Sequence, residues 1–220
     1  TLSSLDLSLE GARADRLAEL ALEEALADGA AVAALRGERR YEAGVKATAL
    51  PEARLDLPQG AHVLITGGFG GIGLTIAEDL IRRHAVKITL IARRPLPERG
   101  LWRAYLAKHD PSDPVARRIL ALQRLEALGG EVLVAQGDVA NVVEMEAARD
   151  AGVARFGPVH AVIHAAGVVA DGPLMAKKPG EVDDVLAPML LGTQLLDRLF
   201  PDGSVAVMVL LRLRPSVMTR

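Results

Sequence analysis

The pattern of hydrophobic and polar positions changes near residue 61. From there to residue 211, short apolar runs alternate with longer segments in which apolar residues recur every three or four positions. Short apolar runs are typical of buried strands, and the longer spacing is typical of amphipathic helices. We expect strands at residues 63–66, 88–92, 131–137, 158–164 and 205–211, and helices at residues 72–81, 115–128, 141–156 and 182–200. This alternation predicts an α/β fold, a Rossmann-type doubly wound parallel sheet with helices on both faces.

Residues 1–60 carry a different pattern and are predicted to form a small partial structural subdomain followed by a linker. Residues 14–28 have the spacing of an amphipathic helix. Its apolar face is expected to comprise Leu17, Leu20, Ala21 and Ala25, widened by Leu22 and Leu26. Two short strands with a turn at residues 36–38 are expected next. Arg39 and Arg40 form either a binding patch or the solvated edge of a sheet. We expect the helix of this unit to pack beside the larger unit.

A cluster of glycines separates the first strand of the larger unit from its helix, in the run Thr66-Gly67-Gly68-Phe69-Gly70-Gly71-Ile72-Gly73. Gly68, Gly70 and Gly73 have the spacing of the dinucleotide-binding fingerprint G-x-G-x-x-G. One glycine permits a tight turn, one lets the backbone approach a pyrophosphate, and one lets helix and strand pack closely. The N–H groups and the positive dipole end of the helix then face the phosphates. A glycine-rich turn without a ligand is the alternative, but the flanking strand and helix favour a nucleotide site.

The second strand is followed directly by Arg93 and Arg94. Arg93 lies about twenty residues past Gly73, where the fingerprint places the residue that reads the ribose. An acidic residue there would bind the 2′-hydroxyl of NAD, whereas a basic residue favours the 2′-phosphate of NADPH. The alternative to a role in cofactor binding is that Arg93 and Arg94 are a solvated pair of arginines at a strand end. The sequence therefore predicts NADPH as the cofactor.

The carboxyl ends of the third and fourth strands carry further candidate contacts. Asp138 follows the third strand and is placed either to meet the adenine or to cap a turn. Residues 165–167 follow the fourth strand and have almost no side chain, so they would leave room for ribose and nicotinamide. His164 is interpreted as a packed or hydrogen-bonded histidine at a strand end rather than as a catalytic base.

Composition excludes several classes of function. The chain has 220 residues, of which 50% are hydrophobic and 25% charged, as expected of a soluble globular protein. The net charge of −2 indicates neither a nucleic acid nor an anionic membrane as partner. The absence of cysteine excludes a disulfide framework and agrees with a cytoplasmic protein. No apolar run is long enough to predict a membrane span, and no metal site is predicted. The first residue is Thr1, which favours the interpretation of the chain as a piece of a larger polypeptide.

Several spaced motifs resemble the short-chain dehydrogenase/reductase pattern, namely the glycine run, Gly137-Asp138-Val139 and His164-Ala165-Ala166-Gly167. Residues 162–174 and 185–192 resemble the ketoreductase domain of modular polyketide synthases. Residues 36–41 resemble the end of the structural subdomain that precedes the catalytic part of that domain. The motifs stand in the family's order, and the resemblance covers nearly the whole chain to about residue 210. On these residues the sequence is identified as a member of this ketoreductase family.

The resemblance implies an activity, a cofactor and partners. The implied reaction is hydride transfer from NADPH to the β-keto group of an acyl chain bound to an acyl carrier protein, within a polyketide synthase module. The implied cofactor contacts are the glycine run Thr66 to Gly73, Arg93, Arg94, Asp138, Val139, Ala165, Ala166 and Gly167. In the family, a tyrosine donates the proton and a serine hydrogen-bonds the ketone oxygen, while a lysine and an asparagine support them.

None of these four catalytic residues can be assigned in this chain. The family's lysine belongs after Pro188, where this chain has Met189, and a thioether cannot donate a hydrogen bond. The only tyrosines are Tyr41 and Tyr105, both before the fourth strand. The family's serine belongs just past the fifth strand, but residues 211–220 look unlike the family. We therefore expect no useful rate of ketone reduction by this chain.

Three functions stay open at this point. The chain is a truncated NADPH-dependent β-ketoreductase, an inactive NADP-binding or structural remnant of a polyketide synthase module, or a different reductase or epimerase of the same superfamily. The segments at residues 36–41 and 185–192 argue against the last. In the first two cases residues 61–220 form an NADP-binding Rossmann domain that is incomplete at its C-terminus. Apolar residues there are then expected to be exposed, such as Val207, Val209 and Leu211.

Overall fold

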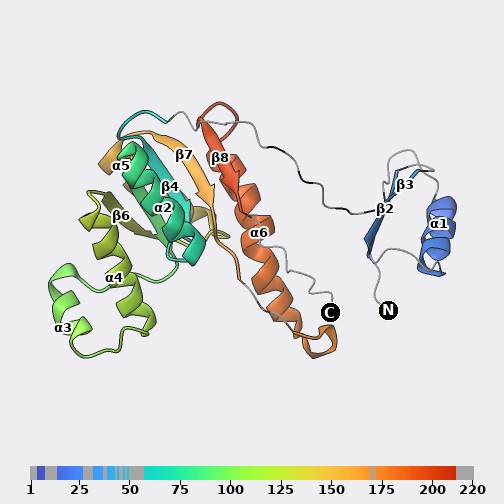
Figure 1. Cartoon of the computed structure of the whole chain (residues 1–220), viewed down its shortest axis with the longest axis horizontal. Coiled ribbons are helices and arrows are strands. Elements are labelled where there is room, and N and C mark those ends of the chain that lie inside the picture. The colour runs from blue at the N-terminus through green and yellow to red at the C-terminus, as the bar shows by residue number, and fades with distance from the viewer. Residues whose placement is uncertain are drawn as a thin grey trace. The chain divides into compact units, whose positions relative to one another are not determined.

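The computed structural model describes residues 4–7, 14–26, 32–36, 39–42, 44, 47, 49, 57–168, 170 and 172–211. The chain forms two compact units, residues 1–54 and 55–220 (Figure 1). Across the described part of the chain, every helix is too short or too polar to cross a membrane.

The smaller unit combines a three-stranded sheet with one helix. Its elements are β1 (Ser4–Leu7), α1 (Ala14–Leu26), β2 (Val32–Arg36) and β3 (Arg39–Glu42). The central strand, β2, pairs in parallel with β1 and antiparallel with β3. The predicted helix and both predicted strands are confirmed, whereas β1 is an additional strand. Of the predicted turn, residues 37 and 38 lie outside the described residues, as do residues 27 and 28 of the predicted helix.

The apolar face of α1 is narrower than its sequence predicts. Leu17, Leu20 and Ala21 are half-buried, as expected. Leu22 and Leu26 are 62% and 78% exposed, so the prediction that they widen the buried face is wrong. Ala25 is exposed as well. The helix turns a polar residue toward the sheet instead, since Glu24 is half-buried.

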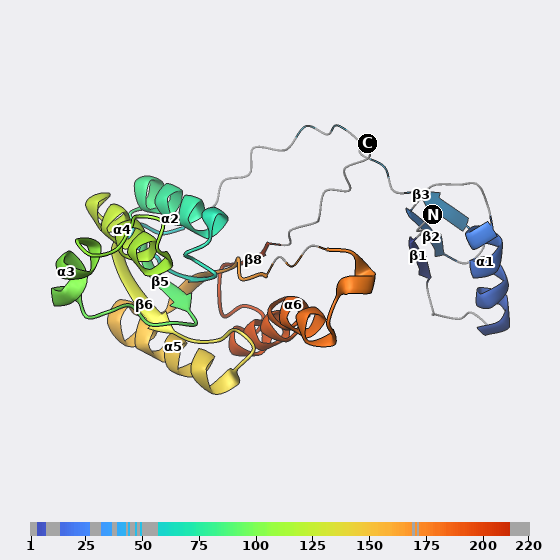
Figure 2. The ribbon, with the colours of Figure 1, turned by 90° about the horizontal axis from the view of Figure 1, so that it is seen from below.

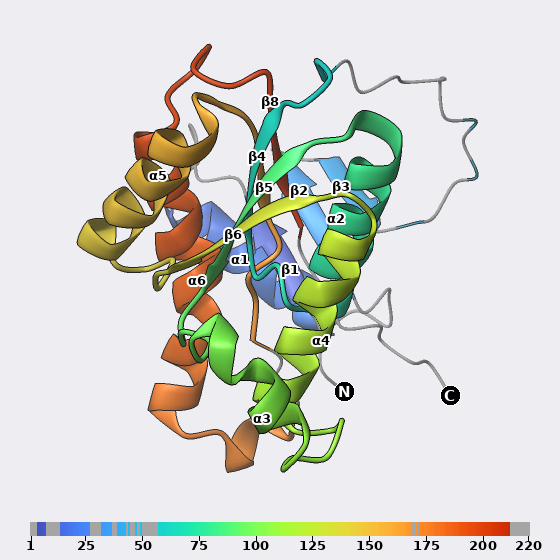
Figure 3. The same ribbon diagram turned by 90° about the vertical axis from the view of Figure 1, so that its left-hand side faces the viewer.

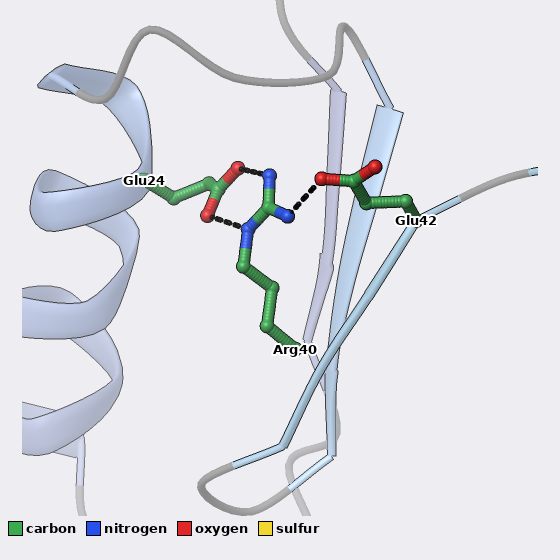
Figure 4. A network of polar contacts seen from close by, with 3 residues as sticks. All are labelled: Glu24, Arg40 and Glu42. Carbon is green, nitrogen blue, oxygen red and sulfur yellow. Dashed lines mark hydrogen bonds and ion pairs between the residues drawn. The ribbon is translucent and has the colours of Figure 1, made fainter.

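Glu24 forms an ion pair with Arg40 of β3 (Figure 4). Arg40 Nε and Nη2 each donate a hydrogen bond of 2.6 Å to the Glu24 carboxylate, and Nη1 donates to Glu42. These bonds raise the pKa of Arg40 above its ordinary value and lower the pKa of Glu24. Arg40 therefore ties α1 to the sheet and is not a free cation for binding. Arg39 is exposed, as the solvated-edge alternative predicts.

The larger unit alternates strands and helices throughout. Its strands are β4 (His62–Thr66), β5 (Lys87–Ala92), β6 (Glu131–Gln136), β7 (Val159–His164) and β8 (Val207–Leu210). Its helices are α2 (Gly71–His84), α3 (Trp102–Leu106), α4 (Pro114–Ala127), α5 (Val142–Phe156) and α6 (Pro179–Leu199), with 3-10 turns η1 (Arg99–Leu101) and η2 (Leu174–Ala176). The strands are all parallel, in the order β6-β5-β4-β7-β8. The predicted Rossmann-type sheet is confirmed.

Helices cover both faces of this sheet because side chains alternate along each buried strand. Val63 and Ile65 of β4 pack into a core with residues of α2 and α4. Leu64, between them, packs into a second core with residues of α5 and α6. Figures 2 and 3 show the sheet between these two layers of helices.

Three details of the larger unit differ from the sequence prediction. Ile72 is 46% exposed, so the buried face of α2 begins with Gly73 and not with Ile72. The helix α3 was not predicted; within it Trp102 is buried, and its Nε1 donates to the Pro97 carbonyl at 2.8 Å. The exposure expected of Val207, Val209 and Leu211 is wrong, because these side chains are partly buried against the core on the α2 side. Leu210 of β8 is 50% exposed.

Candidate cofactor-binding site

A cavity of about 680 Å³ opens at the carboxyl ends of the strands. The chain moves from β4 to β5 and β6 on one side of the sheet, and then returns to place β7 on the other side of β4. In doubly wound sheets, ligands bind outside the carboxyl ends of the strands at such a reversal. The cavity is lined by the turn after β4, by the segments that follow β5, β6 and β7, and by one face of α6.

The glycine turn after β4 lies against the end of β7. Gly67 has a φ of +64°, in the left-handed region that glycine tolerates best. A Cβ atom on Gly67 would lie 2.5 Å from the Ala165 carbonyl oxygen and 2.6 Å from Ala166 Cα. A Cβ atom on Gly73 would lie 2.8 Å from the Gly67 oxygen and from Gly68 Cα. The turn, α2 and β7 can therefore pack this closely only with glycine at these positions.

The N-terminus of α2 differs from those of α4 and α5. Asp113 and Asn141 cap α4 and α5 by accepting hydrogen bonds from backbone N–H groups of the first turn. At α2 the N-cap residue is Gly70, which has no side chain to do so. The first N–H groups of α2 therefore have no side-chain cap, and the helix dipole favours an anion at this end.

Three arginines stand beside this turn. Arg93 and Arg94, which follow β5, are exposed and line the cavity. Arg118 of α4 also lines it and is half-buried. The Cζ atom of Arg118 lies 4.6 Å from the centroid of the Phe69 ring, and Nη2 donates to the backbone carbonyl of Arg94. Burial, together with the nearby charge of Arg94, lowers the pKa of Arg118.

Asp138 lines the cavity at the end of β6 and also shapes its own turn. Its Oδ1 accepts a hydrogen bond of 2.9 Å from the Ala140 N–H. Its N–H donates to Glu144 at 2.8 Å, and Glu144 also accepts from the side chain of Asn141 at 2.9 Å. The turn-cap interpretation of Asp138 is therefore confirmed, and contact with an adenine stays a prediction.

His164 is buried and both of its ring nitrogens are engaged. Nε2 lies 2.8 Å from the Pro188 carbonyl of α6, and Nδ1 lies 2.6 Å from Thr66 Oγ1. Because a carbonyl only accepts, we assign the proton to Nε2, so that Nδ1 accepts from the threonine hydroxyl. Burial lowers the pKa of His164 and favours this neutral form. The interpretation as a hydrogen-bonded strand-end histidine is confirmed: it ties β4, β7 and α6 together.

The cavity brings together most of the predicted cofactor contacts. Those that line it are Gly67, Phe69, Gly70, Arg93, Arg94, Asp138, Val139, Ala165, Ala166 and Gly167. The remaining ones, Thr66, Gly68, Gly71, Ile72 and Gly73, do not line it. No sequence signal pointed to Arg118, because tertiary packing of α4 brings it to the turn. Asp184, Ala187 and Pro188 of α6 were also missed as cavity residues, although residues 185–192 carry part of the family resemblance.

The described lining of the cavity holds none of the residue types that the family uses to protonate a ketone. Among the described residues that line the cavity there is no tyrosine, serine or lysine. Tyr105 lies outside the lining, on α3, and its hydroxyl donates to Asp113 at 3.1 Å. Burial and that hydrogen bond raise the pKa of Tyr105. Tyr41 belongs to β3 of the smaller unit.

The chain is similar to known proteins over most of its length. The KR domain model matches residues 61–213. The 5-methyl-1-naphthoate synthase of Streptomyces sahachiroi is 35% identical over 147 residues, which are 67% of this chain and 8% of that protein. The 6-methylsalicylic acid synthase of Aspergillus terreus is 36% identical over 142 residues, 63% of this chain and 8% of that protein. The chain thus spans only 8% of the length of these curated relatives.

Solved structures agree with this relationship. A ketoreductase from the first module of phoslactomycin biosynthesis in Streptomyces sp. HK803 is 29% identical with a TM-score of 0.68, over 94% of this chain and 44% of that one. A ketoreductase domain from the bacillaene assembly line shares the fold, with a TM-score of 0.69 at 20% identity over 94% of this chain and 45% of that one. Because the KR domain model matches more than half of the chain, the chain belongs to the KR domain family, the polyketide synthase ketoreductases of the short-chain dehydrogenase/reductase superfamily.

Proposed function

We propose that this chain supplies the NADPH-binding part of a polyketide synthase β-ketoreductase. The reaction is reduction of a β-ketoacyl thioester, held by an acyl carrier protein, to the β-hydroxyacyl form. The observation that carries the proposal is the cavity at the reversal of strand order, which is lined both by Gly70, the N-cap residue of α2, and by Arg93, Arg94 and Arg118. Residues 61–220 would then be the NADP-binding domain, and residues 1–60 the end of a structural subdomain with its linker.

The residues present fit such a cofactor. The turn from Thr66 to Gly73 would receive the pyrophosphate. Gly68 and Gly73 would contribute close packing, and Gly71 and Ile72 backbone, rather than cavity surface. Arg93 and Arg94 would bind the 2′-phosphate, because guanidinium groups pair well with phosphate. Asp138 and Val139 would border the adenine. Ala165, Ala166 and Gly167 would leave space for ribose and nicotinamide.

The residues of this chain account for binding and orienting NADPH, but they do not account for proton transfer to the ketone oxygen. NADPH supplies a hydride when bound, and the ketone oxygen needs a proton at the same time. No tyrosine, serine or lysine lines the described cavity, and Met189 follows Pro188 where the family resemblance calls for lysine. These two observations favour a second candidate function, a catalytically inactive NADP-binding or structural remnant of a polyketide synthase module.

Both candidate functions include NADPH binding, which a cofactor titration tests. Titration of the chain with NADPH and with NADH, followed by nicotinamide fluorescence or calorimetry, should give tighter binding of NADPH. Arg93→Asp should erase or reverse the preference, because a carboxylate repels the 2′-phosphate and suits a 2′-hydroxyl. Equal affinities of the unaltered chain for the two cofactors would contradict the role given to Arg93.

Turnover separates the candidates. NADPH oxidation should be measured with a cyclic ketone and with a β-ketoacyl thioester mimic, beside an intact ketoreductase. We expect binding without useful turnover, because positioned proton transfer alone contributes roughly 10²–10⁴-fold. A rate within about tenfold of the intact enzyme, equivalent to about 1.4 kcal/mol in the barrier, would show that another group supplies the proton and that the chain is an active reductase.

A further inference from the structure

Arg118 is a half-buried cation whose charge no carboxylate of the described residues balances. Its side chain lines the cavity together with Arg93 and Arg94. Within the described part of the chain, none of these three guanidinium groups forms an ion pair with an aspartate or glutamate. Taking a charge partly out of water beside a like charge is unfavourable unless an anion joins it.

Another arginine of the same helix shows the contrast. Arg124 has a side chain that is 64% exposed, and it pairs with Glu78 of α2. Arg118 is more buried and lies beside Arg94, and yet it faces the cavity without a counter-charge from the described residues. The lowered pKa of Arg118 reflects the same imbalance, since burial and the charge of Arg94 both disfavour its cationic form. An anion in the cavity would remove the imbalance.

The guanidinium group of Arg118 is also held in place. Phe69 lies under it at 4.6 Å from Cζ, and the Arg94 carbonyl accepts from Nη2. An arginine carries five N–H donors, and this is the one hydrogen bond that Arg118 makes within the described residues. The remaining donors are therefore available to a ligand, and the group loses little freedom when the ligand arrives.

We propose that Arg118 is a specificity-determining residue that donates hydrogen bonds to the 2′-phosphate of the dinucleotide. This inference rests on the NADPH binding proposed above and adds a residue from a different element of the fold. Arg93 and Arg94 follow β5, whereas Arg118 reaches the site from α4 and is fixed by the glycine turn through Phe69. A phosphate monoester matches the planar, charged fork of a guanidinium better than a hydroxyl does.

The test compares ligands with and without the 2′-phosphate. The full chain is titrated with NADPH and NADH, and by calorimetry with 2′,5′-ADP, 3′,5′-ADP and 5′-AMP. Arg118→Gln removes the charge but keeps a donor for the Arg94 carbonyl, and Arg118→Lys keeps the charge. The matched control is Arg117→Gln, because Arg117 is exposed on the same helix and does not line the cavity. Circular dichroism confirms that each variant is folded.

Arg118→Gln should weaken NADPH and 2′,5′-ADP by roughly 10- to 100-fold, the range of a charge-assisted hydrogen bond. Its effect on NADH and 5′-AMP should stay within about twofold, and Arg118→Lys should recover part of the loss. A parallel loss for all ligands would overturn the inference, because Arg118 would then act only through the turn. The inference would also be overturned if Arg118→Gln left the affinity for NADPH unchanged, or if it weakened 2′,5′-ADP and 3′,5′-ADP equally. If the unaltered chain binds neither NADPH nor 2′,5′-ADP, the proposed function fails and this inference fails with it.

Discussion

Gly67 is the position where a single added methyl group tests the packing of the site most directly. Its φ of +64° lies in the left-handed region. A Cβ atom would meet three backbone atoms of residues 165 and 166 at 2.5 to 2.6 Å, and backbone cannot turn aside as the end of a side chain can. Gly67→Ala must therefore move the turn, the end of β7, or both.

The cost of Gly67→Ala has two parts. A non-glycine residue in the left-handed conformation costs about 1–2 kcal/mol. Forcing extra volume into a packed site costs about 1–3 kcal/mol more. Together they predict a loss of roughly 2–5 kcal/mol in the free energy of unfolding, a large share of the 5–15 kcal/mol that is typical of a domain.

Gly71→Ala is the matched control, four residues along the same run. A Cβ atom on Gly71 would meet no other atom within 4 Å, and the residue begins α2. Alanine is at least as good a helix residue as glycine, so stability should stay the same or rise slightly. Urea denaturation measures both variants, and NADPH titration reports whether the turn has moved. If both variants unfold within about 0.5 kcal/mol of the unaltered chain, a margin typical of harmless surface changes, the close packing argued for Gly67 is wrong.

The sheet could be predicted because its signal is local. Each strand of the larger unit is a short apolar run, and a strand buried on both faces needs apolar residues at every position. Val63, Leu64 and Ile65 illustrate this, because neighbouring residues serve opposite cores. The glycine run was predictable for the same reason: its spacing is fixed by a turn that lies within a few residues of the chain.

The sequence predictions were wrong or incomplete where tertiary contacts determine which residues are buried or which residues line the site. Ile72, Leu22 and Leu26 fit a helical stripe, but spacing alone cannot say which part of the stripe meets a neighbour. The strand β1 alternates Leu5 and Leu7 with polar residues, a signal that was present but short. Arg118 could not have been assigned to the site from sequence, because only the packing of α4 against the glycine turn brings it there.

Two further predictions concern a helix cap and two buried histidines. Asn141→Ala should cost about 0.5–2 kcal/mol in urea denaturation, because Asn141 Oδ1 accepts from two backbone N–H groups at the start of α5. Asn141→Ser, which keeps a capping oxygen without setting a second carboxylate beside Glu144, should cost less. His62 and His164 are buried and hydrogen-bonded through both ring nitrogens, and burial lowers the pKa of each. The unfolded chain therefore takes up protons first as the pH falls below about 6.5, the ordinary pKa of histidine. Stability should be greatest above that pH and should decline as the pH falls from about 7.5 to about 5.5, since stability rises with pH wherever the unfolded state binds more protons. His164→Gln should flatten part of this decline in urea denaturation at the two pH values. An unchanged slope in His164→Gln would show that burial does not lower the pKa of His164 in the folded chain.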